Sequence, residues 1–272
     1  MWNWLLAGAL AVAGLTLIVR LFESRFAFFP APGADMTPTD LGIPFTRTTL
    51  TTADGERLEA WSLPHRAARA SILYFHGNGG NLSVWAPILV DVHRRGFEVH
   101  AIDYRGYGLS TGRPSEQGLY RDADAFVAWA SQNIRATLPV LYWGRSLGST
   151  VAAYAATVRP PDGLILEAGF PSARALLNGS LPLAVLSRLS SYRFPTAAYA
   201  ATVGVPILII HGDADRVIPH QLGRALFERL PQGAQFVTIP GGDHNDLRPA
   251  DERVYWQAVD AFVASLARIP EP

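Results

Sequence analysis

The chain has 272 residues, no net formal charge, 49% hydrophobic residues, 17% charged residues and no cysteine. This length and composition are typical of one large folded domain and exclude a disordered chain. Without cysteine there is no disulfide, no thiolate metal site and no cysteine nucleophile. The basic residues are all arginine and form no run of like charge, so nucleic acid is not expected as a partner.

The amino terminus is apolar over a length that suits a membrane. From Trp2 to Phe22 only three polar residues interrupt the run, and a helix of this length covers about 30 Å at about 1.5 Å per residue. We predict a single-pass membrane anchor over residues 1–25. The alternatives are a secretory signal peptide, although no basic segment precedes the apolar run, and a buried core helix. Because Arg20 and Arg25 follow the apolar core, the positive-inside rule favours a cytoplasmic location for the rest of the chain.

Residues 26–44 carry several prolines and glycines, so we predict an irregular connector there and a folded domain over residues 45–272. The domain opens with an antiparallel hairpin over residues 45–64. Beyond it, short apolar runs alternate with segments of helical periodicity. Strands are predicted at 71–75, 97–103, from Val140 onward, 163–167, 205–211 and 235–239, and helices over 82–92, 115–130, 149–158, 221–230 and 251–266. This alternation predicts an α/β fold with a mostly parallel central sheet flanked by helices, and ligands beyond the carboxyl ends of its strands.

The strand that begins at Val140 ends in the motif Gly144-Arg145-Ser146-Leu147-Gly148, which has the pattern G-x-S-x-G. A serine on a sharp strand-to-helix turn needs room for its neighbours, and Gly144 and Gly148 supply it. The helix that follows would direct free N–H groups and its positive dipole end toward an oxyanion. The pattern therefore indicates a nucleophile at Ser146. The alternative is an ordinary strand-to-helix connection with a capping serine.

A serine hydroxyl becomes a good nucleophile only beside a base, and that base needs an acid to fix its tautomer. Of the seven histidines, only His244 lies in a glycine-rich loop after the last predicted strand, so we predict it as the base. Asp215 follows the preceding strand and is the predicted acid, because Asp213 lies too close to the strand end to turn toward His244. Glu167 is the reserve candidate, and Asp243 is expected to be a loop residue.

An oxyanion hole needs two N–H groups aimed at the developing charge. The backbone of Leu147 offers one, and the backbone of Asn78, in the glycine-rich loop after the first central strand, offers the other. Those glycines could instead cradle a phosphate, but the chain has no lysine and no G-x-x-x-x-G-K-[ST] motif. His76 and His211 are expected to brace turns. No metal or organic cofactor is implied.

Five motifs together carry a resemblance to a known family. They are His76-Gly-Asn-Gly-Gly-Asn81, Asp103-Tyr-Arg-Gly-Tyr-Gly-Leu-Ser110, Gly144-Arg-Ser-Leu-Gly148, His211-Gly-Asp-Ala-Asp215 and Gly241-Gly-Asp-His244. The chain resembles the α/β-hydrolase superfamily, specifically the membrane-anchored serine hydrolases of the bud-emergence (Bem-type) branch. The resemblance implies an α/β-hydrolase fold over residues 45–272, a catalytic triad of Ser146, Asp215 and His244, and an oxyanion hole formed by Asn78 and Leu147. A serine at the elbow argues against haloalkane dehalogenases and epoxide hydrolases.

The segment between Glu167 and Asp213 contains no acidic residue, and its leucines are mixed with Arg174, Arg188 and Arg193. We expect a small cap after the sixth strand, where an apolar surface would accept an acyl chain and the arginines would lie near a carboxylate or lipid phosphate. The alternative is a core helix with solvated arginines.

The predicted function is a membrane-anchored serine hydrolase that cleaves carboxylic esters or thioesters of small-molecule acyl substrates through an acyl-enzyme. The alternatives are an amidase or peptidase, and a non-catalytic adaptor with the α/β-hydrolase fold.

Overall fold

A computed structural model describes residues 2–134, 137–179, 181–246 and 250–266. Its centre is an eight-stranded sheet in the order β10-β9-β8-β7-β4-β6-β3-β2. The strands are β2 Thr46–Thr51, β3 Arg57–Leu63, β4 Ser71–Phe75, β6 Glu98–Ile102, β7 Val140–Arg145, β8 Gly163–Glu167, β9 Ile207–Gly212 and β10 Gln235–Ile239. The hairpin of β2 and β3 is antiparallel and most other pairs are parallel, as the sequence predicts, whereas the antiparallel pair of β3 with β6 was not predicted.

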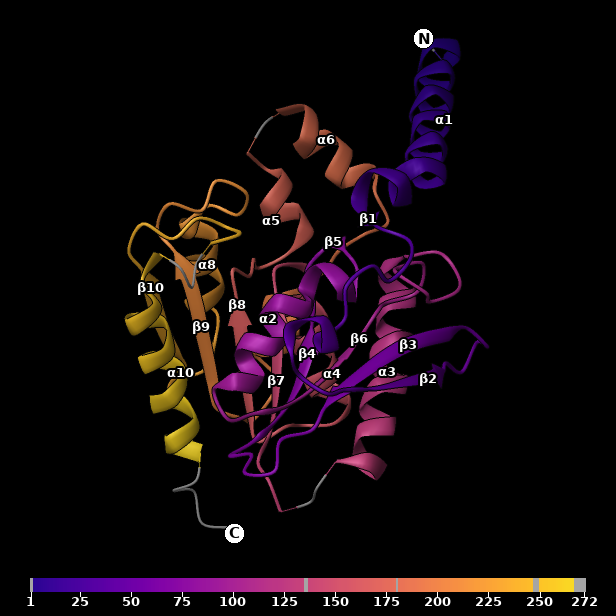
Figure 1. The fold of residues 1–272 in the computed structure, drawn as a ribbon. Helices are drawn as coiled ribbons and strands as arrows, with labels where there is room; N and C mark the ends of the chain where they lie inside the picture. Colours follow the sequence, from indigo (N-terminus) through magenta and orange to yellow (C-terminus); the bar gives the residue numbers. More distant parts are fainter. Residues whose placement is uncertain (1, 135–136, 180, 247–249, 267–272) are drawn as a thin grey trace.

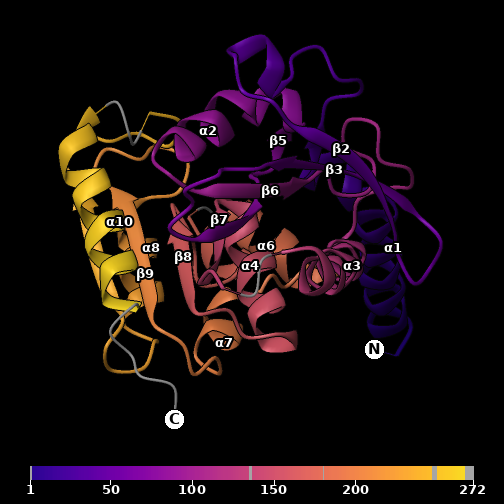
Figure 2. The ribbon, with the colours of Figure 1, turned by 60° about the horizontal axis from the view of Figure 1, so that its bottom comes forward.

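Helices cover both faces of this sheet (Figures 1 and 2). The helices of the described chain, including α1, α5 and α6, which do not lie on the sheet faces, are α1 Trp2–Ala27, α2 Leu82–Arg94, α3 Glu116–Asn133, α4 Leu147–Val158, α5 Ala173–Leu177, α6 Leu181–Leu189, α7 Thr196–Ala200, α8 His220–Phe227 and α10 Glu252–Leu266, with a 3-10 turn over Pro38–Leu41. The first turns of α2 and α3 are capped by the side chains of Asn81 and Ser115, which accept hydrogen bonds from backbone N–H groups.

Every residue of β4 is buried, because successive side chains enter different halves of the core. Leu73 and Phe75 pack with the apolar faces of α3 and α4. Ile72 and Tyr74 pack with α2 and α10 on the other face. A strand covered on both sides reads as a continuous apolar run, which is why the sequence locates β4 so well.

Helix α1 stands apart from this core. None of its residues is buried, and it is long and apolar enough to cross a membrane. It continues to Ala27, a few residues beyond the predicted apolar span. The chain then forms a short strand β1 (Phe29–Pro30) that pairs in parallel with β5 (Gly79–Gly80), a contact that the sequence did not indicate. Phe28, between the end of α1 and the start of β1, is buried against the rings of Tyr192 and Phe194.

Helices α5 and α6 follow β8, the sixth strand of the sheet in chain order, and lie above its carboxyl edge (Figure 1). Helix α6 contacts α1. Its one buried side chain is Ser187, so α6 lies outside the core and the alternative of a core helix is wrong for it.

Candidate active site

Strand β7 turns sharply into α4 at Ser146. This residue has φ 55° and ψ −119°, a combination that costs a non-glycine residue energy and persists only where the surroundings impose it. The Ser146 N–H donates to the carbonyl of Glu167 at 2.8 Å, which fixes the turn to the neighbouring strand β8. The strain and its position at the carboxyl end of a central strand match the nucleophile-elbow pattern.

Two glycines make the turn possible because other backbone atoms occupy the space of their missing side chains. A Cβ on Gly148 would lie 1.9 Å from the carbonyl oxygen of Phe75. A Cβ on Gly144 would lie 2.2 Å from the carbonyl oxygen of Gly148. The predicted need for room at both glycines is confirmed, and the close contact brings the start of α4 against the end of β4.

The structure brings Ser146, His244 and Asp215 together, each from a different loop at the same edge of the sheet. His244 Nε2 lies 3.1 Å from Ser146 Oγ. Its Nδ1 lies 2.8 Å from Asp215 Oδ2. Asp215 and His244 are both buried, with 6% and 9% of their surface exposed. Asp215 follows β9 and His244 follows the adjacent β10, so the pairing of these strands sets the two side chains opposite each other.

Asp215 is held as a carboxylate in one orientation. Its Oδ1 accepts hydrogen bonds from the N–H groups of Val217 at 2.9 Å and Ile218 at 2.7 Å, which leaves Oδ2 for His244. Burial by itself acts to raise the pKa of Asp215, but hydrogen bonds from His211, His244 and Ile218 outweigh it and lower this pKa well below its ordinary value. An ionised Asp215 can only accept at Oδ2, so the 2.8 Å contact suits a neutral His244 ring with its proton on Nδ1 and with Nε2 facing Ser146 Oγ.

The other carboxylates weighed from the sequence serve other contacts. Asp213 accepts from the N–H of Gly241 at 2.7 Å and joins the two loops. Glu167 accepts from Trp143 Nε1 and the Tyr255 hydroxyl below the elbow. Asp243 pairs with Arg216. Within the described residues, none of the three is hydrogen-bonded to the His244 ring.

Arg145, inside the motif, has a role that the sequence did not reveal. Its Nη2 donates to the carbonyl of His244 at 2.6 Å, and its Nε lies 3.4 Å from Glu167 Oε1. Burial acts to lower the pKa of Arg145, but Glu167 outweighs it and the pKa is raised. The guanidinium therefore stays charged and ties the elbow to the loop that carries His244. The one sequence feature that could have indicated this role is an arginine at the end of an otherwise apolar strand.

The two predicted oxyanion amides lie on segments that flank Ser146. Leu147 is the first residue of α4, so its N–H has no intrahelical acceptor. Asn78 lies in the loop after β4, where its carbonyl oxygen and Oδ1 both accept from the Tyr107 hydroxyl at 2.9 Å. This loop packs beside the elbow, since a Cβ on Gly77 would lie 2.9 Å from the Trp85 ring and 3.5 Å from the Arg145 carbonyl.

His76 and His211 are fully buried, and both brace turns as predicted. The His76 ring lies against the rings of Tyr104 and Tyr107, with centroids 4.3 and 5.3 Å away. His211 Nε2 lies 2.8 Å from the carbonyl of Ile218, in the loop that carries Asp215.

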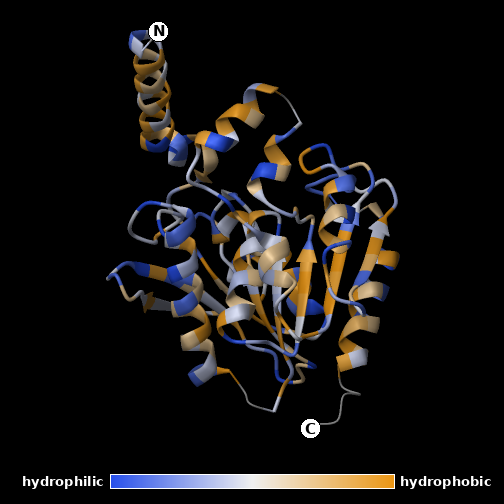
Figure 3. Ribbon diagram, turned by 180° about the vertical axis from the view of Figure 1, so that it is seen from behind, coloured by the Kyte–Doolittle hydropathy of each residue, from blue (hydrophilic) through white to orange (hydrophobic). Residues whose placement is uncertain are grey.

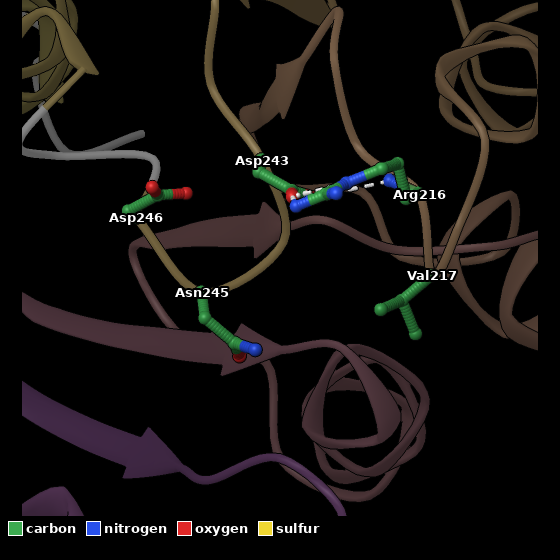
Figure 4. Close-up of a pocket in the computed structure, with 5 residues that line it drawn as sticks. All are labelled: Arg216, Val217, Asp243, Asn245 and Asp246. Carbon is green, nitrogen blue, oxygen red and sulfur yellow. Dashed lines mark hydrogen bonds and ion pairs between the residues drawn. The ribbon is translucent and has the colours of Figure 1, made fainter.

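A surface pocket adjoins the loops that carry Asp215 and His244. Figure 4 shows its lining: Arg216, Val217, Asp243, Asn245 and Asp246. Arg216 and Asp243 face each other across it and form an ion pair, so their charges are mutually satisfied. Over the described part of the chain, no group of three histidine, aspartate or glutamate side chains is arranged to hold a metal.

The family model described as serine aminopeptidase, S33, matches residues 66–202, about half of the chain. The chain belongs to this family of α/β-hydrolases. A protein of Mycobacterium tuberculosis, described as uncharacterized, is 34% identical to this family member over 95% of this chain and 93% of its own length. An uncharacterized membrane protein of Saccharomyces cerevisiae is 32% identical over 84% of this chain and 82% of its own. An α/β-hydrolase domain-containing protein of Arabidopsis thaliana is 30% identical over 96% and 93%.

Solved structures share the fold of this α/β-hydrolase. A Pyrococcus furiosus esterase superposes with a TM-score of 0.71 at 17% identity, covering 88% of this chain and 97% of the esterase. An α/β-hydrolase from a Penicillium species superposes with a TM-score of 0.66 at 18% identity, covering 84% and 100%. The predicted α/β-hydrolase fold is confirmed, and the likeness to a yeast membrane protein is consistent with the Bem-type branch.

Proposed function

We propose that this α/β-hydrolase cleaves carboxylic ester or thioester bonds through an acyl-enzyme, with Ser146 as nucleophile, His244 as base and Asp215 as acid. The observation that supports this most is the continuous contact from Asp215 Oδ2 to His244 at 2.8 Å and from His244 to Ser146 Oγ at 3.1 Å, at a strained elbow. A capping serine in an ordinary turn would need neither the strain nor the ionised acid behind the histidine.

In the proposed acylation step, Ser146 Oγ forms a bond to the substrate carbonyl carbon while His244 Nε2 takes the hydroxyl proton. The carbonyl oxygen becomes an oxyanion, for which the N–H groups of Leu147 and Asn78 are the proposed donors. When the tetrahedral intermediate collapses, the bond to the leaving oxygen or sulfur breaks and His244 returns its proton to that atom.

In the proposed deacylation step, water takes the place of the leaving group. His244 removes a proton from the water as its oxygen attacks the acyl carbon, then protonates Ser146 Oγ as the ester bond to the enzyme breaks. Asp215 stabilises the imidazolium in both steps through its charge. These steps need no cofactor.

The cap favours esters and thioesters over the peptides that the family description suggests. An aminopeptidase must hold the ammonium group at the substrate's amino terminus, which an acidic side chain does best. The segment from residue 168 to residue 212 has no acidic residue, while Arg174, Arg188 and Arg193 are exposed. Acyl substrates with a neutral or anionic leaving portion fit this charge better.

We propose that α1 anchors the enzyme in a membrane as a single span, with residues 26–44 as connector and 45–272 as the catalytic domain. The support is the length and apolarity of α1, together with the absence of any buried residue in it. Arg20 and Arg25 at its carboxyl end favour a cytoplasmic catalytic domain.

The test is labelling of the full chain in detergent by a fluorophosphonate, which phosphonylates activated serines. The parent should label, and Ser146→Ala and His244→Ala should not. Ser149→Ala is a matched control, because this nearby buried hydroxyl only donates to the carbonyls of Gly144 and Glu167. A folded parent that fails to label would contradict the hydrolase mechanism and favour the adaptor. Turnover of acyl esters should then exceed that of aminoacyl anilides.

A further inference from the structure

Exposed large apolar side chains gather at the edge of the sheet that carries Ser146. Outside α1, the described chain exposes ten such side chains. Eight lie on segments that follow carboxyl ends of parallel strands or pair with them, and we call these the apolar rim: Phe29, Val84, Leu109, Leu181, Leu183, Val185, Leu186 and Val217. The other two are Val158, near the carboxyl end of α4, and Met36, whose N–H donates to Ser83 beside Val84. An apolar concentration of this kind at one edge marks an interaction surface.

Helix α6 supplies half of the rim, and its burial is the reverse of that expected for a soluble amphipathic helix. Its one buried residue is the polar Ser187, whereas Leu181 is 80% exposed. Leu181 and Val185 lie one turn apart, about 120° and 160° round the helix from Ser187 at 3.6 residues per turn, and both are exposed. Their side chains therefore point away from the protein.

Helix α6 is fixed to the carboxyl end of α1. The carboxylate of Glu23 accepts hydrogen bonds from the Ser190 hydroxyl at 2.6 Å, from the Ser191 N–H at 2.9 Å and from the Ser191 hydroxyl. Figures 1 and 3 show α6 beside the lower end of α1, with hydrophobic residues along the span of α1 and along α6, and hydrophilic residues where the two helices meet. A bilayer that receives α1 therefore meets α6 at its surface.

The charges of this region suit an anionic surface. Helix α1 and residues 168–212 together carry five exposed arginines: Arg20, Arg25, Arg174, Arg188 and Arg193. Their single acidic residue is Glu23, which the serines occupy. Arginines that flank an apolar face bind the headgroups of anionic lipids.

We propose that the apolar rim, α6 foremost, lies in the interfacial layer of an anionic bilayer, so that Ser146 receives an amphiphilic acyl substrate from the membrane rather than from water. This inference rests on the proposed membrane anchor and acyl hydrolysis. It assigns the cap a lipid surface as its partner.

The natural absence of cysteine makes the surface directly testable in the full chain. Leu181→Cys and Val185→Cys are each labelled with an environment-sensitive fluorophore and reconstituted in phosphatidylcholine vesicles with and without phosphatidylserine, doped with brominated lipid as quencher. Gln132→Cys, exposed at the far end of α3, is the matched control, and Leu10→Cys reports insertion of α1. Both α6 positions should lose about half or more of their emission in anionic vesicles, because interfacial helices lie about 5–10 Å into the boundary layer.

Two outcomes would overturn the proposal. One is quenching at Leu10→Cys while both α6 positions stay as bright as Gln132→Cys. The other is an intermolecular disulfide through unlabelled Val185→Cys in the vesicles, which would make a second copy of the chain the occupant.

An activity measurement separates this proposal from the proposed function. The double variant Leu181→Glu/Val185→Glu should lose about tenfold or more of kcat/KM on a long-chain ester in vesicles, since each charge near an anionic surface is worth about a factor of five. Its kcat/KM on a short soluble ester should match the parent. A double variant that matches the parent in kcat/KM on both esters would refute membrane delivery. A parent enzyme that is inactive on the soluble ester would instead refute the hydrolase assignment.

A second observation concerns the segment Ala27–Gly33, which we call the anchor base. The Asn78 side chain donates to the carbonyl of Ala27 at 2.7 Å, and the Ala31 N–H donates to the carbonyl of Gly80 at 2.9 Å. The Asn81 side chain donates to the carbonyl of Gly33 at 2.9 Å. The anchor base thus contacts the glycine-rich loop after β4 at three successive places.

The geometry points to the anchor base as the element that positions the Asn78 amide of the proposed oxyanion hole. A loop with three glycines among residues 77–81 has little conformational preference of its own, so ties from outside decide where its N–H groups point. Phe28, the second residue of the anchor base, is buried and holds this segment to the domain.

The test compares Phe28→Ala and Asn78→Ala with Ser24→Ala, which removes the hydrogen bond from the Ser24 hydroxyl to the carbonyl of Pro114 but leaves the Phe28 ring and the Asn78 side chain in place. Both test variants should lower kcat about tenfold or more and weaken a trifluoromethyl ketone by a similar factor, because a misplaced oxyanion donor costs up to about 10³ in kcat. KM should stay near the parent value. If Phe28→Ala does not fold, Asn78→Ala alone tests the inference, because it removes the side-chain bond to Ala27 and keeps the backbone N–H of the proposed oxyanion hole. Parent-like kcat in Asn78→Ala would overturn the inference.

Discussion

Replacing Asp215 with asparagine is the sharpest test of the site, because the structure predicts how the amide would be oriented. Asp215 Oδ1 accepts two backbone N–H groups, from Val217 and Ile218. The asparagine oxygen would take this place, since only an oxygen can accept both bonds. Its NH2 group would then face His244 Nδ1, where Oδ2 lies 2.8 Å away in the parent.

The consequence is the wrong tautomer of His244. An NH2 donor at Nδ1 forces the ring to carry its proton on Nε2, which then points a hydrogen at Ser146 Oγ and cannot accept one. In a serine protease the same replacement lowers kcat by about 10⁴, which corresponds to about 5.4 kcal/mol in the activation barrier. We expect a loss of that order in kcat for a soluble ester.

The matched control is Asp213→Asn, because this side chain needs only an acceptor for the Gly241 N–H and its amide oxygen supplies one. It should stay within about threefold of the parent, as expected for a residue outside the proton path. An Asp215→Asn enzyme within tenfold of the parent would refute the assignment of the acid, provided that its thermal unfolding is unchanged.

The same pair of proteins gives a prediction about pH. The folded pKa of Asp215 is lowered from 3.8, so its charge contributes stability that is complete above this value and is lost as pH falls below it. The difference in the free energy of unfolding between parent and Asp215→Asn should be constant between about pH 5 and 7 and move against the parent below about pH 4. A difference that grows in favour of the parent in acid would contradict the direction of the shift.

Two further substitutions test the supports of the elbow. Gly148→Ala places a Cβ 1.9 Å from the Phe75 carbonyl and should lower the free energy of unfolding, measured in urea, by about 3 kcal/mol or more. The control is Gly204→Ala, which has open space around it and should change this free energy by less than about 0.5 kcal/mol. Equal effects of the two substitutions would contradict the crowding at Gly148. Arg145→Met leaves buried Glu167 without its charge partner and should cost about 3–5 kcal/mol in the same measurement while also lowering kcat. A folded Arg145→Met enzyme with the kcat of the parent would show that the hydrogen bond from Arg145 to the His244 carbonyl is not needed for activity.

Much of the fold could be predicted because its local signals agree with one another. The bounds of β4, β8 and β10 coincide with the predicted apolar runs at 71–75, 163–167 and 235–239. These runs are short and bounded by glycine, proline or polar residues, and those of β4 and β8 are buried throughout, which suits central strands of a sheet covered on both faces. Parallel strands also collect their following loops at one edge, so a serine, an acid and a histidine in separate loops could be expected to meet there.

Tertiary structure decided three features that leave no periodic trace in the chain. The bond from Arg145 to His244 spans 99 positions, the pairing of β1 with β5 joins segments about 50 positions apart, and the contact of Glu23 with Ser191 spans 168. Composition showed that α6 is apolar but not which way it faces. Propensity and periodicity act over a turn or a strand pair, whereas these contacts depend on how complete elements pack, and this packing sets α6 beside α1 at the edge that holds Ser146.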